Sequence, residues 1–428
     1  MEKELSKKDF WLLTLVTYFS MVCQGFIDNA RGFTSVIMRD YFGADYIAYG
    51  VYNGLCTAGY VVFAMIAAFM QPRYGFKTVF LCGFIGGLIG CLLTASATAY
   101  PLVIIYQFLA ASGMGFNDVA PTSMGSIIFT THQATFFSIM NFFYGLGAVA
   151  GPSFSSVIYN WLPQYSFRGV YIAMSIVIAL LSIYVIFCPF AVKYPPVDDK
   201  TPETKNKLTT VGCLKNGMVW FFSIIVMLFE MGERAPSNWA GVYIKDVLKM
   251  DETVVANFNT LYYLIFSLMR FAGGFISDRI GYYLTMYIML ALTIVLYIAG
   301  FLIDGWGIWL LCATGICTSF YWPTFMCIVM NYFGDLSAIP ISVILPLQAL
   351  LQSIAQFPLG YINDTFGAEW AYRATPLFIF LALILIMVVQ CIQRKKDAAT
   401  KDLETGLLEN PEKAAPEQTE TVQSAWSF

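Results

Sequence analysis

Two aspartates have the setting needed for proton transfer, because each lies inside a long apolar stretch of the chain. Asp28 is followed three residues later by Arg31, so the two side chains can pair on one helix face. Asp118 lies three residues before Pro121, and a proline loosens a helix and frees a backbone carbonyl. A desolvated carboxyl group can take up and release a proton near neutrality, as coupling to a proton gradient requires. The alternative for each aspartate is a static ion pair that holds two helices together.

Ionisable side chains in the second half of the chain indicate either anion binding or internal pairing. Arg270 stands alone in an apolar stretch, where an unpaired guanidinium is costly. It can clamp a substrate carboxylate through two parallel hydrogen bonds or pair with an acid from another helix. Glu230 and Arg234 are spaced for pairing along one helix. We therefore expect Glu233, which is offset from that pair, to face a cavity together with Asn238.

Amide and aromatic side chains offer a second kind of chemistry, namely hydrogen bonding to a neutral polyhydroxyl solute. Gln348, Gln352 and Gln356 recur every fourth residue and form one polar stripe on an apolar helix. Hydrogen bonding between helices is the alternative role for this stripe, and the buried arginines favour an anion instead. The candidate solute-binding residues are Arg31, Asn53, Asn117, Asn141, Tyr144, Glu233, Asn238, Arg270, Tyr321, Trp322, Gln348 and Gln352.

The composition of the chain makes these polar side chains informative. Hydrophobic residues make up 58% of the 428 residues and charged residues only 12%, and the mean hydropathy is +0.67. Soluble proteins carry about 25% charged residues, so a soluble enzyme is excluded. The net charge of −3, with no basic block, argues against a nucleic-acid partner. The ten cysteines are scattered and His132 is the single histidine, so we expect no metal, cofactor or disulfide framework.

Apolar runs long enough to cross a bilayer recur twelve times, and they must be helices because lipid cannot satisfy an open backbone. A hydrophilic segment after the sixth run divides the spans into two sets of six. We predict an all-α membrane protein with two six-helix bundles of pseudo-two-fold symmetry, namely 1–192 and 217–393, joined by a cytoplasmic linker at 193–216 and followed by a disordered cytoplasmic tail at 394–428. The predicted spans are 10–37, 46–70, 76–97, 100–127, 132–161, 168–193, 217–244, 253–277, 282–303, 306–333, 338–363 and 370–392.

The distribution of lysine and arginine predicts the orientation of the spans. With a cytoplasmic N-terminus, sixteen basic residues lie in inside segments and five in outside segments, and the other three lie within spans. Such an excess of basic residues marks the cytoplasmic side of a membrane protein. Both termini are therefore expected to be cytoplasmic, with the plasma membrane as the first expectation and an organelle membrane as the alternative.

The turn after the eighth predicted span carries a distinctive motif, G-x-x-x-D-R-x-G, formed by Gly274, Asp278, Arg279 and Gly281. Gly274 permits close helix approach, and Asp278 can pair with a helix N-terminus or a neighbouring arginine. The motif resembles the short cytoplasmic loop motif of the major facilitator superfamily. The loop after the second span holds a partial copy without the aspartate, which fits an internal repeat of six helices.

A closer resemblance covers roughly the first 160 residues. The stretch from Gly25 to Arg31 looks like the first span of the L-fucose/proton symporter family. Gly113-Met-Gly-Phe-Asn-Asp118 resembles the fourth span of that family, whose G-x-G-F-x-E motif carries a proton-linked carboxylate; here Asp118 replaces the glutamate. This resemblance implies a secondary transporter that moves a small polar solute by alternating access, with proton-coupled sugar uptake as the leading function and Asp28 and Asp118 as proton carriers.

Other functions stay open from the sequence. Monocarboxylate transporters resemble this chain at Arg270, in an R-x-x-x-G pattern, so organic-anion transport through Arg31 and Arg270 is the alternative. A solute receptor that does not transport is another possibility on the same fold. A membrane enzyme has no support from a Ser/His or paired-His arrangement. The expected partners are the solute, protons and the lipid bilayer, and the chain is expected to be a monomer.

Overall fold

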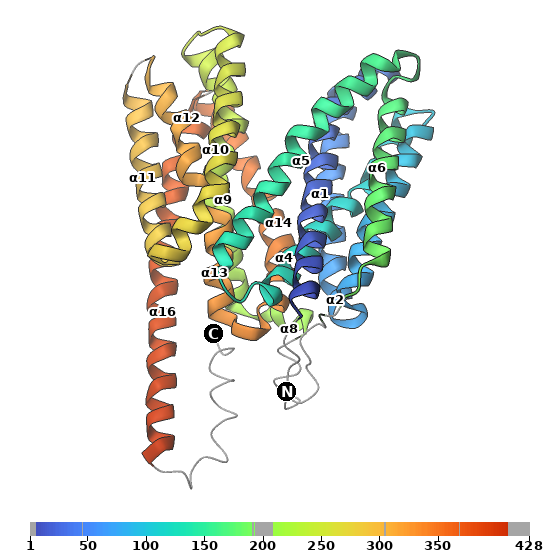
Figure 1. Ribbon diagram of the computed structural model, residues 1–428. Helices are drawn as coiled ribbons and strands as arrows, with labels where there is room; N and C mark the ends of the chain where they lie inside the picture. The colour runs from blue at the N-terminus through green and yellow to red at the C-terminus, as the bar shows by residue number, and fades with distance from the viewer. Residues whose placement is uncertain are drawn as a thin grey trace. The chain divides into compact units, whose positions relative to one another are not determined.

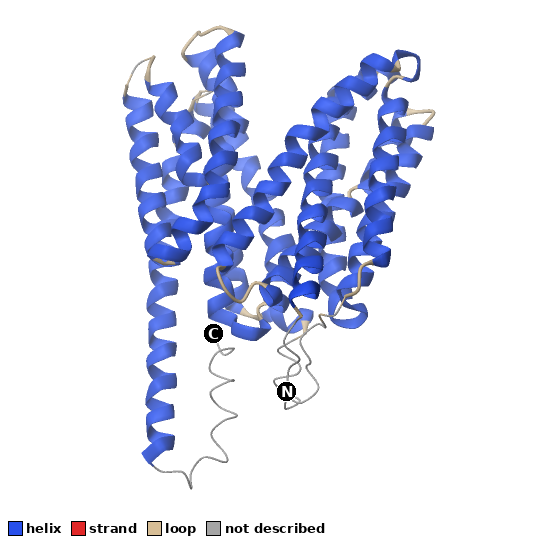
Figure 2. Cartoon of the chain, in the orientation of Figure 1, coloured by secondary structure: helices blue, strands red, loops and turns tan. Residues whose placement is uncertain are grey.

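Helices and the short loops that connect them make up the residues that the structure describes. The computed structural model describes residues 6–44, 46–190, 192, 209–303, 305–367 and 369–409. No strand occurs within these ranges (Figure 2). Helices satisfy their own backbone hydrogen bonds, which a membrane interior requires. The predicted all-α fold class is confirmed.

The first half of the chain forms the first six predicted spans. The second and third spans share the label α2 but are two helices separated at Gly75, whereas the fourth span is made of two helices that meet at Ala111. Residues 163–165 add one turn of 3₁₀-helix between the fifth and sixth spans. The helices, all but α3 labelled in Figure 1, are α1 (Lys7–Phe42), α2 (Tyr46–Ser96), α3 (Tyr100–Ala110), α4 (Ser112–Ile128), α5 (Gln133–Trp161) and α6 (Phe167–Phe187).

The second half forms the remaining six spans. The tenth predicted span is divided into two helices around Phe320, and the seventh ends in one turn of π-helix. The elements are α8 (Thr210–Lys215), α9 (Gly217–Val242), η2 (Tyr243–Val247), α10 (Glu252–Ile280), α11 (Tyr282–Leu302), α12 (Gly307–Thr318), α13 (Tyr321–Phe333), η3 (Gly334–Leu336), α14 (Ala338–Phe366), α15 (Trp370–Arg373) and α16 (Thr375–Glu409).

Residue contacts group the chain into two compact units. The first turn of α5 is assigned to the second unit and the first turns of α14 to the first unit. The first unit comprises Met1–Thr131, Ile139–Pro196 and Ala338–Pro346. The second unit comprises His132–Ser138, Val197–Ser337 and Leu347–Phe428.

Most of these helices suit a membrane by length and composition. Ten helical stretches in the described part of the chain are long and apolar enough to cross a bilayer, and one of them, 51–96, contains two predicted spans. The predicted seventh span, α9, is not among the ten, and it carries Glu230, Glu233 and Arg234. Its 26 residues nevertheless give a length of about 39 Å, which exceeds a hydrocarbon core of about 30 Å.

The reversal between the second and third spans depends on a glycine. Gly75 has φ 74° and ψ 171°, which interrupts the helical dihedral angles of α2. A positive φ of this size is easily adopted only by glycine. Gly281 has a φ of 91° at the corresponding turn before α11. The complete loop motif and its partial copy therefore share a glycine turn.

The hydrophilic segments differ in part from their predictions. Within the predicted linker, residues 193–208 lie outside the described residues, and α8 begins after Thr209, whose side chain accepts a hydrogen bond from the Gly212 amide at 3.0 Å. The predicted disordered tail begins at residue 394, but α16 continues to Glu409 and extends past the end of α11 (Figure 1). Alanine, lysine, glutamate and leucine dominate this extension and favour helix. Residues 410–428 lie outside the described part.

Close packing of α1 against α5 depends on small residues. A Cβ atom at Gly147 would lie 2.9 Å from the Phe26 amide nitrogen, and one at Gly151 would lie 3.0 Å from the Ala30 nitrogen. Side chains larger than hydrogen therefore do not fit without a backbone shift. This agrees with the use of small residues at interfaces between membrane helices. The close approach brings the polar residues of α1 within hydrogen-bond distance of α5.

Candidate functional site

A polar cluster in the first unit joins three of the predicted site residues, Asp28, Arg31 and Tyr144, and we call it the Asp28 cluster. Arg31 Nη2 donates to Asp28 Oδ1 at 3.1 Å, which confirms the predicted pairing along α1. The Tyr144 hydroxyl, on α5, donates to Asp28 Oδ2 at 3.0 Å. The side chains of Asp28 and Arg31 remain 29% and 22% exposed. The Asp28 carboxylate therefore neutralises the Arg31 guanidinium within the predicted span, and both side chains remain partly exposed.

The second predicted proton carrier, Asp118, lies in α4 and contacts α2. The Tyr60 hydroxyl donates a hydrogen bond to Asp118 Oδ2. Tyr60 is absent from the sequence predictions, because a single tyrosine in an apolar span does not stand out in a tyrosine-rich chain. One partner of Asp118 is therefore a phenol. The alternative that the sequence leaves open is an ion pair between Asp118 and an arginine.

Pro121 affects the backbone next to Asp118 as expected. Proline has no amide hydrogen, so the carbonyl of Asn117, four residues earlier, loses its helical donor. The Ser20 hydroxyl of α1 donates to that carbonyl at 3.5 Å. The Thr122 hydroxyl donates to the Asp118 carbonyl at 2.8 Å. Side-chain hydroxyls therefore donate hydrogen bonds to two backbone carbonyls in the helical turn that carries Asp118.

The predicted amide residues of the first unit have varied surroundings. Asn117 is fully buried, and its side-chain amide has no hydrogen-bond partner within the described residues. A Cβ at Gly83 of α2 would lie 2.7 Å from Asn117 Oδ1, so the amide occupies the space that this glycine leaves. Asn53 is exposed and donates to the Tyr49 carbonyl at 3.1 Å, and Asn141 is buried in α5. Their roles in solute binding remain predictions.

The second unit contains a buried ion pair between two predicted site residues. Arg270 Nη2, on α10, donates to Glu233 Oε1, on α9, at 2.9 Å. The side chains are only 9% and 15% exposed, respectively. The Arg270 guanidinium also lies 4.5 Å from the centre of the Phe266 ring. The sequence leaves two partners open for Arg270, a substrate carboxylate and an acid from another helix. In the structure Arg270 pairs with the acid from another helix, Glu233.

Additional contacts fix this pair. The Tyr262 hydroxyl donates to the Glu233 backbone carbonyl at 2.7 Å. Within the described residues, Glu233 Oε2 and Arg270 Nε are buried without a hydrogen-bond partner. The side chain of Asn238, predicted to accompany Glu233, lies outside the described residues. Tyr262 and Phe266 could have been found by their spacing, since they precede Arg270 by eight and four residues on one face of α10.

The neighbouring acid and base on α9 behave as predicted. Glu230 and Arg234 form an ion pair with a distance of 3.7 Å, and the Arg234 side chain is 59% exposed. Trp239, at the end of the same helix, packs against the apolar cluster of Met231, Leu359 and Ala371. This environment is that of a packed aromatic side chain in the second unit.

The remaining predicted binding residues of the second unit are mostly buried. The Tyr321 hydroxyl donates to Thr293 Oγ1 at 2.6 Å, and Tyr321 is fully buried between α13 and α11. Trp322 is 8% exposed. Gln348 Oε1 and Gln352 Nε2 are buried and have no hydrogen-bond partner in the part of the chain that the structure describes. The Gln356 side chain lies outside the described residues, so the predicted stripe is seen only in part.

The loop motif after the eighth span caps a helix. Asp278 accepts hydrogen bonds from the amides of Ala134 and Thr135 at 3.2 and 3.0 Å and from Thr135 Oγ1 at 2.6 Å. These amides begin α5, so the carboxylate lies at the positive end of a helix dipole. The Tyr282 hydroxyl donates to the same carboxylate at 3.0 Å. The predicted pairing of Asp278 with a helix N-terminus is confirmed, and Arg279 is exposed to solvent.

Two bacterial proteins match parts of this chain. The tetracycline resistance protein, class H, of Pasteurella multocida is 21% identical over 190 residues, which cover 44% of this chain and 47% of that protein. The probable nitrate/nitrite antiporter NarK1 of Thermus thermophilus is 24% identical over 286 residues, or 65% of this chain and 62% of that protein. The chain therefore spans about half to three fifths of the length of these two relatives.

Solved structures with the same fold include the fucose:proton symporter FucP of Escherichia coli. A single-residue variant of that protein superposes with a TM-score of 0.74 at 15% identity, covering 90% of this chain and 99% of that chain. Likeness at this identity establishes the fold. The sequence profile of the Major Facilitator Superfamily matches residues 11–339, which is most of the chain. The chain is therefore a multi-pass membrane protein that belongs to the Major Facilitator Superfamily.

Proposed function

We propose that this transporter couples the movement of a small polar solute, a sugar, to protons by alternating access. The observation that carries the proposal is the Asp28 cluster, in which a carboxylate in the middle of α1 pairs with Arg31 and still remains 29% exposed. Ionisable side chains at span depth are retained for function in most membrane proteins. The fold shared with a fucose:proton symporter supports the same function.

The contacts of Asp28 suggest how proton binding acts on solute binding. The charge of Asp28 balances Arg31 while the carboxylate accepts from Tyr144. A proton on Asp28 removes that charge, and Arg31 can then donate to an acceptor on the solute. Proton binding and solute binding thereby favour each other, which is the requirement for symport.

Asp118 adds a second carboxylate that can respond to a proton. As a carboxylate it accepts from the Tyr60 hydroxyl. Once protonated it becomes a donor itself, so the direction of this hydrogen bond can reverse. Because Tyr60 lies on α2 and Asp118 on α4, protonation alters a contact between two helices. We assign Asp118 to proton binding on this basis.

Transport by purified protein in vesicles tests the proposal. Labelled sugars and labelled carboxylates are compared for accumulation driven by an inward proton gradient, and for counterflow without a gradient. Asp118→Asn should abolish gradient-driven sugar accumulation and leave counterflow intact. Asp335→Asn, at an exposed carboxylate in η3, is the matched control and should change neither activity. Sugar accumulation by Asp118→Asn equal to that of the wild-type protein would overturn the proposed role.

An organic or inorganic anion is the second candidate solute. Arg31 is 22% exposed, whereas the Arg270 side chain is 9% exposed and already pairs with Glu233. The accessible guanidinium is therefore Arg31, and the name of the related NarK1 protein indicates an anion for that relative. Uptake of a carboxylate but of no sugar in the same vesicles, lost in Arg31→Gln, would favour this candidate.

A further inference from the structure

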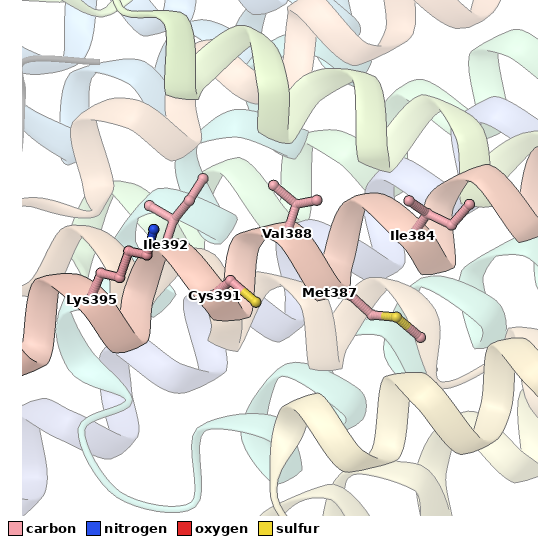
Figure 3. Close-up of a pocket in the computed structure, with 6 residues that line it drawn as sticks. All are labelled: Ile384, Met387, Val388, Cys391, Ile392 and Lys395. Carbon is pink, nitrogen blue, oxygen red and sulfur yellow. The ribbon is translucent and has the colours of Figure 1, made fainter.

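The outer face of α16 carries an apolar groove that ends in a lysine. Its lining consists of Ile384, Met387, Val388, Cys391, Ile392 and Lys395 (Figure 3). These positions follow the spacing i, i+3, i+4, i+7, i+8 and i+11, which is one stripe along a helix. The groove has a volume of about 350 Å³, within the range of about 300–1,000 Å³ that ligand sites occupy.

The groove face is directed to lipid, whereas other residues of α16 bind the helix to its own unit. Gln390 and Gln393 accept hydrogen bonds from Tyr287 and Tyr283 of α11 at 2.8 and 2.5 Å. In the groove, by contrast, Ile384, Met387 and Val388 are 40, 46 and 40% exposed. An apolar surface of this exposure in a membrane helix is covered by hydrocarbon.

The basic residues at the end of the groove divide by role. Lys396 donates to the Tyr332 carbonyl at 2.8 Å and lies 4.8 Å from the Tyr332 ring, so it holds α16 against α13. Lys395 is exposed, and it makes no hydrogen bond or ion pair with any residue that the structure describes. Arg394 precedes it and is also exposed. Lys395 therefore provides the basic side chain at the end of the apolar groove, and Arg394 is the adjacent base along the helix.

The length of the groove matches one leaflet of a bilayer. The helix from Ile384 to Lys395 rises by about 17 Å at about 1.5 Å per residue. Half of a hydrocarbon core of about 30 Å is about 15 Å. An acyl chain lying along the groove would therefore place its headgroup at the level of Lys395. A free phosphate in water would leave the apolar part of the groove unused.

We propose that this groove binds an anionic phospholipid, with one acyl chain along Ile384, Met387 and Val388 and the headgroup phosphate on Lys395. The ammonium group complements the phosphate, and its methylene stem lies on the apolar wall. Arg394 strengthens the preference for a negatively charged headgroup. Clusters of basic residues next to a membrane helix attract anionic lipids by the same electrostatics.

Lipid retention by the purified full-length protein tests this site. Native mass spectrometry measures binding of phosphatidylglycerol and of phosphatidylcholine to the wild-type protein and to variants. Lys395→Ala should lower the preference for phosphatidylglycerol about five-fold, the equivalent of about 1 kcal/mol per basic residue near a headgroup. Val388→Trp fills the groove and should reduce binding of the lipid that Lys395 retains. Glycerol phosphate, which has the charge without the chain, should not compete.

Arg73→Ala is the matched control, because Arg73 is an exposed base in the turn between the second and third spans, on the same predicted side of the membrane. The proposal is wrong if the wild-type protein shows no preference for phosphatidylglycerol. It is also wrong if Arg73→Ala lowers that preference as much as Lys395→Ala, since the effect would then come from net charge. Competition by glycerol phosphate would identify a phosphate site in place of a lipid site.

Discussion

The Asp28–Arg31 pair of the first unit and the Glu233–Arg270 pair of the second unit have the same chemistry in different surroundings. Their distances are similar, at 3.1 and 2.9 Å. The first pair is local to α1 and leaves its side chains 29% and 22% exposed. The second pair joins α9 to α10 and leaves 15% and 9% exposed. An ion pair in a membrane protein can therefore be partly exposed and able to change its contacts, or buried and holding two helices together.

Burial decides which of these roles a pair can have. A sealed pair without water cannot lose one charge cheaply, since removing one partner leaves an uncompensated buried charge. A partly exposed pair exchanges contacts with water or solute at lower cost. We therefore propose proton and solute chemistry for Asp28 and Arg31, and a mainly structural role for Glu233 and Arg270.

The largest expected effect is loss of stability in Arg270→Ala. The substitution leaves the Glu233 carboxylate buried without its cation, so we expect a loss of about 3–5 kcal/mol in the free energy of unfolding. Denaturant unfolding in mild detergent, followed by tryptophan fluorescence, measures this loss. Arg279→Ala removes an exposed arginine and is the matched control. Equal unfolding midpoints for the two variants would show that the buried pair contributes nothing to stability.

The double variant Glu233→Ala/Arg270→Ala sharpens the same result. Removing both charges eliminates the uncompensated carboxylate, so part of the lost stability should return. The contrary outcome is additivity. If the double variant loses as much stability as Glu233→Ala and Arg270→Ala lose together, the two side chains do not interact.

Asp28→Asn should reverse the balance between stability and function. The asparagine oxygen can still accept from Arg31, and its amide nitrogen can donate to the Tyr144 hydroxyl oxygen. The site is also partly exposed, so the expected loss of stability is about 1 kcal/mol. Proton-driven accumulation should be lost in the same variant. Unfolding and vesicle uptake are measured on one preparation. Retained accumulation together with severe destabilisation would assign Asp28 to structure.

Tyr144→Phe is expected to have the smallest effect. It removes one hydrogen bond to Asp28 and retains the aromatic ring, so the unfolding free energy should fall by about 0.5–1 kcal/mol. Accumulation should weaken without disappearing, because Arg31 still pairs with Asp28. Complete loss of transport would show that the phenol itself is required.

The sequence predicts the fold well because lipid imposes simple rules on it. Apolar runs and the hydrophilic segment after the sixth span identify the helices in order. The breaks within the fourth and tenth spans, at Ala111 and near Phe320, escape prediction. No proline lies near Ala111, where the geometry depends on neighbouring helices. At the second break, Pro323 in the first turn of α13 has no amide hydrogen for the carbonyl of Ser319, four residues earlier, so the sequence does carry a signal there. The helical extension of α16 is not predicted either, because its polar composition is also typical of a disordered tail.

Contacts between residues that are close in the sequence could be predicted, whereas most contacts between distant residues could not. The Asp28–Arg31 and Glu230–Arg234 pairs are local, and helical spacing alone predicts them. The Glu233–Arg270 and Asp118–Tyr60 contacts join residues that are 37 and 58 positions apart. These contacts depend on which faces of two helices meet, and periodicity does not determine that. Asp278 is an exception, because its motif predicts a long-range contact.

Proton movement by Asp118→Asn is the most direct test of the central claim, that carboxylates of the first unit carry the coupled proton. Vesicles containing a pH-sensitive dye report the pH change that solute addition induces, and Asp335→Asn serves again as the control. The wild-type and Asp335→Asn proteins should move protons together with solute, whereas Asp118→Asn should exchange solute without any pH change. Solute-induced proton movement by Asp118→Asn at the wild-type rate would contradict the account.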